Sequence, residues 1–169
     1  MKNAELAHES IPNVLAGFVS PVHDDYPKKG LIPSLDRLAM AERALASSSW
    51  ISVSSWEANQ SSWSRTLNVL RKHRELLEQH CQKRIRVVLL MGADVVASLV
   101  SPRVWIPEHV EEILSEFGIV CIERAGGSSL NDLIESHQVF SKNKVTWCDI
   151  FGIILVVGKH LRCSSQDLD

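Results

Sequence analysis

The residues with the clearest chemical potential lie in the stretch "ISVSSWEANQSSWSR", residues 51–65. Three of the chain's five tryptophans, Trp50, Trp56 and Trp63, fall inside or next to it, and Glu57 directly follows Trp56. An indole at a strand end offers a stacking face for a planar heterocycle, and a cationic ring gains further from the π face. The alternative is that Trp56 and Trp63 only pack a helix against the edge of a sheet.

Two further loops carry residues suited to binding a nucleotide. Lys28 and Lys29 precede Gly30, and an ammonium group there could reach a phosphate as a point charge. A solvated turn is the alternative. In "LLMGAD", Gly92 would let a ligand approach the backbone, and Asp94 could accept hydrogen bonds from ribose hydroxyls. Asp94 is equally well explained as a helix N-cap.

Other candidate residues give weaker signals. His23 shares the lysine loop and is interpreted as a loop residue, and the glycine pair of "ERAGGSS" could cradle phosphate but is more typical of a loop. The four cysteines lie 40, 27 and 15 residues apart, without a C-x-x-C pair, and the histidines have no ligand spacing. No metal site made by the protein alone is therefore predicted.

The loops that carry these residues follow strand-like runs. Strands are predicted over residues 13–20, 50–54, 84–92 and 118–123, and a further apolar run, 150–158, has the length of a buried strand. Three helices alternate with them. The first starts near Ser34 as N-cap, with Leu35, Leu38, Glu42 and Leu45 near one stripe. The second runs from about Asn59 to Cys81, with Trp63 on its apolar face. The third runs from Pro107 to Gly118.

This alternation predicts an α/β fold with a mainly parallel sheet. Ligands of such sheets bind beyond the carboxyl ends of the strands, which is where the loops above begin.

Composition narrows the class of protein. The 169 residues fit one domain, and a net charge of −2 gives no general reason to expect nucleic acid or a membrane as partner. No apolar run reaches the ~20 residues of a membrane span, and the first residues do not resemble a secretory signal. We expect an intracellular protein, in the nucleus or cytoplasm.

Six collinear motifs extend this interpretation across about residues 4 to 137. They are "GFVSPVHDDYPKKGLIP", "W-I-x-V-x-x-W-E", "TLNVLRKHRELL", "LLMGADVV", "VWIPEHV" and "FGIVCIERAG". In this order and spacing they resemble the eukaryotic nicotinamide/nicotinic acid mononucleotide adenylyltransferase family. The resemblance implies a Rossmann-like nucleotidyltransferase fold.

The same resemblance implies a reaction and a set of binding residues. Such enzymes transfer AMP from ATP to nicotinamide or nicotinic acid mononucleotide, forming NAD and pyrophosphate, with Mg²⁺ on the ATP phosphates. Trp56 would stack on the pyridine ring with help from Trp105, and Lys29 would face a phosphate. The implied substrate-binding positions are Trp56, Glu57, Lys29, Val104 and Trp105, and the implied ATP-binding positions are Gly92 and Asp94.

The chain also departs from the family pattern. Members open with a strand, a Gly-Ser-Phe-Asn-Pro loop and a histidine, whereas "MKNAELAHE" aligns with the helix after that loop, so the first strand and phosphate loop are expected to be missing. An Ile-Ser-Ser-Thr-x-x-Arg segment near the C-terminus has no match either, and no catalytic residue is assigned. Asp36 replaces a usual histidine and Ser54 a usual acid.

Two consequences follow from these departures. We expect residues 1–144 to form an incomplete nucleotidyltransferase-like domain, followed by a divergent segment, 145–169, with an apolar strand-like run. Neighbouring strands would keep unpaired edges unless that run substitutes for the first strand. The alternative function is a non-catalytic isoform that interacts with other proteins, forms homo- or hetero-oligomers, or acts like a chaperone.

Overall fold

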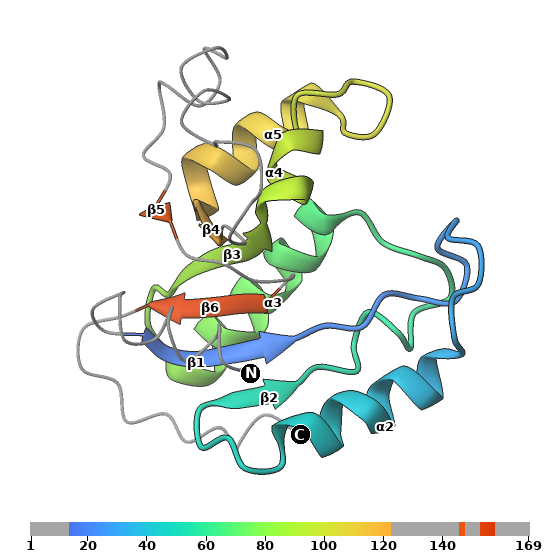
Figure 1. Cartoon of the computed structure of the whole chain (residues 1–169). Coiled ribbons are helices and arrows are strands. Elements are labelled where there is room, and N and C mark those ends of the chain that lie inside the picture. Colours follow the sequence, from blue (N-terminus) through green and yellow to red (C-terminus); the bar gives the residue numbers. More distant parts are fainter. Residues whose placement is uncertain (1–13, 123–145, 148–152, 158–169) are drawn as a thin grey trace.

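The computed structural model describes residues 14–122, 146–147 and 153–157 (Figure 1). The predictions made for "MKNAELAHE", for "ERAGGSS" and for most of the 145–169 segment lie outside these residues.

A six-stranded sheet forms the centre of the molecule, in the order β2-β1-β6-β3-β4-β5. The pairings of β1 with β2, β3 with β4 and β4 with β5 are parallel. The strands are β1 (Val14–Val19), β2 (Ile51–Val53), β3 (Arg86–Gly92), β4 (Ile119–Ile122), β5 (Thr146–Trp147) and β6 (Ile153–Val157). The predicted α/β class with parallel strands is therefore confirmed.

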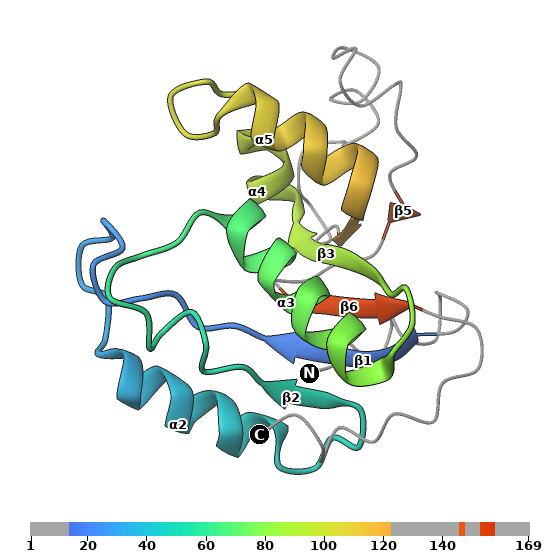
Figure 2. The same ribbon diagram turned by 180° about the vertical axis from the view of Figure 1, so that it is seen from behind.

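Helices surround this sheet. Helix α3 covers one face, α2 flanks the β2 edge, and α4 and α5 lie beside β3 and β4 (Figures 1 and 2). The helical elements are α2 (Ser34–Leu45), α3 (Thr66–Cys81), α4 (Ala93–Ser98), α5 (Pro107–Glu112) and the π-helical turn η1 (Ile113–Phe117). Pro107 begins its helix and Gly118, with φ of 88°, ends the last turn, both as predicted.

The core lies between α3 and the sheet. Strand β3 is buried on both faces, because Val87, Leu89 and Met91 point one way, Val88 and Leu90 the other, and all five are buried. Three leucines of α3 pack into the same cluster: Leu67, Leu70 and Leu77. The prediction that the apolar run from Val87 to Met91 forms a strand buried on both faces is therefore confirmed.

Strand β6 separates β1 from β3 and runs antiparallel to both. Its Leu155 is in register with Gly17 on one side and Val88 on the other. The C-terminal apolar run thus occupies the central position, and the strand edges expected to be unpaired have a partner. Of the five pairings among the described strands, two are antiparallel, so the sheet is less parallel than predicted.

Four local interpretations of helices are wrong. Helix α3 begins at Thr66, not near Asn59, and Trp63 lies in the preceding loop. The serines and asparagine of 58–65 have low helix propensity, because their side chains can compete for backbone hydrogen bonds. Gln60, for example, donates to the carbonyl of Trp56 at 2.7 Å.

The other three errors concern helix starts and a helix face. Ser34 is the first helical residue after Pro33, and its hydroxyl donates to Asp24 Oδ2 at 2.9 Å instead of capping the helix. Helix α2 buries none of its residues, and Leu35 on the expected stripe is 77% exposed. Asp94 likewise lies in the first turn of α4, whose N-cap is Gly92.

Candidate functional site

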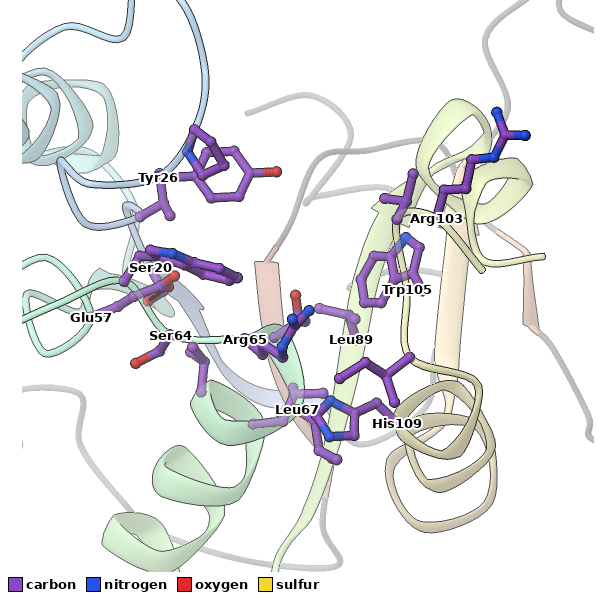
Figure 3. Close-up of a pocket in the computed structure, with 18 residues that line it drawn as sticks. Ser20, Tyr26, Glu57, Ser64, Arg65, Leu67, Leu89, Arg103, Trp105 and His109 are labelled. Atoms are coloured by element: carbon purple, nitrogen blue, oxygen red, sulfur yellow. Dashed lines mark hydrogen bonds between the residues drawn. The ribbon is translucent and has the colours of Figure 1, made fainter. Parts of the chain in front are cut away.

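A cavity of about 500 Å³ opens at the end of the sheet where β1 and β2 terminate (Figure 3). Its walls come from the loops after β1 and β2, the start of α3, and the loop between α4 and α5, with Leu89 of β3 between them. The residues that line it are Ser20, Val22, Tyr26, Pro27, Glu57, Trp63, Ser64, Arg65, Thr66, Leu67, Val69, Leu70, Leu89, Arg103, Val104, Trp105, Ile106 and His109.

Glu57 is the buried acid of this cavity. Val19 and Val53 are in register, and the amide of Ser54 donates to the carbonyl of Val19 at 2.8 Å, so the loops after β1 and β2 start side by side. This brings the hydroxyl of Ser20 within 2.8 Å of Glu57 Oε2, to which it donates.

The environment of Glu57 disfavours its charge. The side chain is 8% exposed, and burial raises the pKa of its carboxyl, although the Ser20 hydrogen bond and the charge of Arg37 act in the opposite direction. The protonated form is therefore favoured more than in water, and the carboxyl can donate a hydrogen bond as well as accept one.

Trp105 forms part of the opposite wall (Figure 3). Its indole N–H donates to Ser98 Oγ at 2.9 Å, and that hydroxyl donates to the carbonyl of Val95 at 2.6 Å. The amides of Val104 and Trp105 both donate to the carbonyl of Ser101 at 3.0 Å. The ring is thus fixed on the last turn of α4, as a stacking surface requires.

An aromatic pair, Tyr26 and Trp63, also lines the cavity near the start of α3. Tyr26 and Trp63 meet edge to face with ring centroids 6.0 Å apart. The guanidinium carbon of Arg65 lies 5.3 Å from the centroid of the Trp63 ring. Neither Tyr26 nor Arg65 was predicted to line a binding site. The one signal was the tripeptide "WSR", which places a cation two residues after an indole.

The predicted site residues fall into two groups. Glu57, Val104 and Trp105 line the cavity, with Val104 60% exposed. The other four are outside the set of lining residues: Lys29, Trp56, Gly92 and Asp94.

Within the second group, Gly92 and Asp94 are neighbours at the end of β3. A Cβ on Gly92 would come within 2.7 Å of Asp94 Oδ1, so a larger residue at this position would require the Asp94 side chain to move. Lys29 is exposed. His23, from the same loop, accepts a hydrogen bond from the amide of Asp25 at 3.0 Å, which suits a loop residue.

Trp56 is not among the cavity-lining residues and packs against the core. Its ring meets His73 edge to face at 6.4 Å. His73 is buried, with Nδ1 2.8 Å from the carbonyl of Val69 and Nε2 2.9 Å from Ser54 Oγ. Since a carbonyl only accepts, Nδ1 carries the proton and Nε2 accepts from the Ser54 hydroxyl. Burial lowers the pKa of His73, so the neutral ring is favoured.

Two absences hold for the part of the chain that the structure describes. There, no group of three or more His, Cys, Asp or Glu side chains is placed to hold a metal ion. No helix within those residues has the length and apolar character that crossing a membrane demands.

The fold agrees with the comparison to known proteins. The chain belongs to the cytidylyltransferase-like family, whose model matches residues 1–165. Within it, the chain is 38% identical over 146 residues to the nicotinamide/nicotinic acid mononucleotide adenylyltransferase of Arabidopsis thaliana, covering 82% of this chain and 61% of that protein. The resemblance predicted from the six motifs is thus confirmed.

Two further relatives carry similar names. The nicotinamide/nicotinic acid mononucleotide adenylyltransferase of Oryza sativa is 38% identical over 77% of this chain and 53% of its own length. For nicotinamide/nicotinic acid mononucleotide adenylyltransferase 1 of Bos taurus the identity is 34%, over 75% of this chain and 58% of that protein. The chain spans between about half and three fifths of the length of these curated relatives.

Proposed function

We propose that the cavity binds nicotinamide or nicotinic acid mononucleotide, and that the chain transfers AMP from ATP to it, forming NAD and pyrophosphate. The observation that carries this proposal is that Glu57 and Trp105 line opposite walls of one cavity at the carboxyl ends of β1 and β2. We place the activity in NAD biosynthesis inside the cell, in the nucleus or cytoplasm.

The cavity suits a pyridine ring for three reasons. The fixed indole of Trp105 offers a flat apolar surface, and a positively charged pyridinium gains from its π face. Glu57 lies on the opposite side, where either protonation state accepts a hydrogen bond from an amide substituent and the protonated form can donate one to a carboxylate substituent. The volume of about 500 Å³ lies within the usual range for a small-molecule site.

Trp56 has a different place in this proposal. Its indole touches His73 now, so it would join Trp105 on the ligand only after turning away from that contact. Single replacement of each tryptophan by alanine separates the two roles. If Trp105 carries the stacking, Trp105→Ala weakens mononucleotide binding by about 1 to 3 kcal/mol, and Trp56→Ala weakens it less.

The transfer itself demands positioning more than chemistry from side chains. The mononucleotide phosphate attacks the α-phosphorus of ATP in line, so holding both nucleotides in register supplies much of the rate. Gly92 and Asp94, side by side at the end of β3, are proposed for the ATP ribose, and Lys29 for a phosphate.

Mg²⁺ fits this arrangement as a companion of ATP. It usually binds through substrate phosphates and one or two carboxylates, so it does not require a group of three or more protein ligands, and none is present among the described residues. When bound, the ion would neutralise charge on the triphosphate.

One observation favours a second candidate function, mononucleotide binding without transfer. Strand β6 occupies the centre of the sheet and pairs with both β1 and β3. In the family this chain resembles, the central strand leads into the loop that binds the ATP phosphates. With β6 in that place, binding and interaction with other subunits would remain while transfer would not.

Two measurements on the purified chain decide between these functions. Titration calorimetry with nicotinamide mononucleotide tests binding, and a coupled assay for NAD with ATP and Mg²⁺ tests transfer. Binding with turnover at rates typical of enzymes supports the first candidate. Binding without NAD formation supports the second, and absence of binding at millimolar mononucleotide contradicts both.

A further inference from the structure

The side chain of Arg65 extends into the cavity between the Glu57 wall and the Trp105 wall (Figure 3). Its backbone is fixed, because the carbonyl of Arg65 accepts from the amides of Asn68 at 2.9 Å and Val69 at 3.2 Å where α3 begins. Its guanidinium lies over the Trp63 ring at 5.3 Å. The charge is therefore held at a defined place in the cavity wall.

Arg65 differs from the other stacked arginine of the chain. Arg74 lies 4.4 Å over Phe117 and also forms an ion pair with Glu116 at 3.8 Å, so its charge helps to join α3 to η1. Among the residues that the structure describes, no carboxylate lies within 4.0 Å of the Arg65 guanidinium. Apart from its stacking on Trp63, Arg65 therefore has no ion pair among these residues that would account for its charge.

The charges around the cavity make it suitable for an anion. Arg65 and Arg103 both line it, whereas Glu57 is the one acid among the lining residues and already accepts from Ser20. Helix α3 has no acidic residue in its first turn and no side-chain cap, so its positive end adds to the same field. An arginine pre-positioned on an aromatic face loses little freedom when it binds a planar or tetrahedral anion.

We propose that Arg65, seated on Trp63, is the residue that binds the anionic group of the ligand in this cavity, as a two-pronged contact to a phosphate monoester or a ring carboxylate. This inference rests on the proposed function, because it names which part of a pyridine mononucleotide the cavity holds. It adds a binding residue that neither the motifs nor the proposed pyridine contacts contain.

Four ligands distinguish the two anionic groups. Nicotinamide mononucleotide has the phosphate only, nicotinic acid riboside the carboxylate only, nicotinic acid mononucleotide both, and nicotinamide riboside neither. Arg65→Gln keeps hydrogen-bond donors but removes the charge, and Arg65→Lys keeps the charge but removes the fork. Arg43→Gln, on exposed α2 and outside the cavity, is the charge-matched control.

We expect Arg65→Gln to weaken binding about 10- to 100-fold for the ligands that carry the recognised anion, and to leave nicotinamide riboside within about twofold. Loss confined to the two mononucleotides assigns the phosphate, and loss confined to the two acids assigns the carboxylate. Arg65→Lys should retain part of the wild-type affinity. Arg43→Gln should bind all four ligands as the wild type does. Unchanged affinity of Arg65→Gln for all four ligands would overturn the inference while leaving the proposed function standing.

The opposite failure is separable as well. If the wild-type chain binds none of the four ligands, titration with inorganic phosphate and with AMP tests the anion site alone. Phosphate or AMP binding that Arg65→Gln removes would support the inference and contradict the proposed function. No phosphate or AMP binding at millimolar concentration would contradict both. Matching far-ultraviolet circular dichroism of the variants confirms that each is folded.

Discussion

The contact between His73 and Ser54 gives the most quantitative prediction. His73→Phe keeps an aromatic ring between Phe18 and Trp56, whose centroids lie 6.1 Å and 6.4 Å from that of His73. It removes the bonds of Nδ1 to the Val69 carbonyl and of Nε2 to the Ser54 hydroxyl. Since each net hydrogen bond contributes about 0.5 to 1.5 kcal/mol, the free energy of unfolding should fall by about 1 to 3 kcal/mol at pH 7.5.

The pH dependence has a definite sign. Burial lowers the pKa of His73 below the ordinary value of 6.5, so the unfolded chain binds a proton more readily than the folded chain as the pH falls below 6.5. The stabilisation due to His73 is complete above that value and decreases in acid. Between pH 7.5 and 5.5 the wild type should lose at most about 1.4 kcal/mol through this residue, the limit in which the folded ring stays neutral.

Urea unfolding followed by tryptophan fluorescence at both pH values measures these differences. We expect the gap between the wild type and His73→Phe to narrow at pH 5.5, because the variant has no imidazole to protonate. His80→Gln, which replaces an exposed histidine at the end of the same helix, is the matched control for the loss of an imidazole. A gap that stays constant or widens in acid would refute the argument for a buried neutral ring.

Three other changes test the sheet and the cavity. Gly17→Ala places a Cβ 2.9 Å from Trp50 Cζ3 and should lower stability by about 1 to 3 kcal/mol in urea titrations, so an unchanged midpoint would contradict this packing. Leu155→Pro, in a strand paired on both sides, should cost about 3 kcal/mol or more, and a normal thermal melt would show that β6 is dispensable. Glu57→Gln should raise the free energy of unfolding on the order of 1 kcal/mol at pH 7.5, because burial raises the pKa of Glu57 and penalises its charge. This gain should vanish below pH 4.5, where the carboxyl is protonated in both states. A gain that persists in acid would contradict the explanation.

Local patterns predicted much of the fold because they reflect local causes. The apolar run of β3 has no polar position between Val87 and Met91, and only a strand covered on both faces satisfies it. Pro107 and Gly118 fix the ends of their helical segment through their own backbone preferences. Helix α3 was predicted too long because Trp63 fits the helical period, although the serines beside it favour a loop.

The cavity was predictable only in part, since its walls join segments that are distant in sequence. Glu57 and Trp105 were found from their positions after strands and in motifs, and both line the cavity. Arg65 was missed because its role depends on the loop that carries Trp63, which had been assigned to a helix. The burial of His73 was missed for a related reason: a polar residue on an apolar helix face gives no sign of its partner, Ser54, 19 residues away.

The direction of β6 affects the two halves of the proposed transferase site differently. Ile153 is in register with Val19 and with Leu90, so β6 brings its amino end to the edge where β1 and β3 finish. A parallel strand in that position would present its carboxyl end and the loop after it, which is where nucleotide phosphates bind in doubly wound sheets. Because β1 and β3 both already pair with β6, a parallel strand could lie between them only if β6 left the sheet. The cavity that holds Glu57, Arg65 and Trp105 is built from elements other than β6, so ligand binding there does not require that exchange, whereas a phosphate loop on a central parallel strand does.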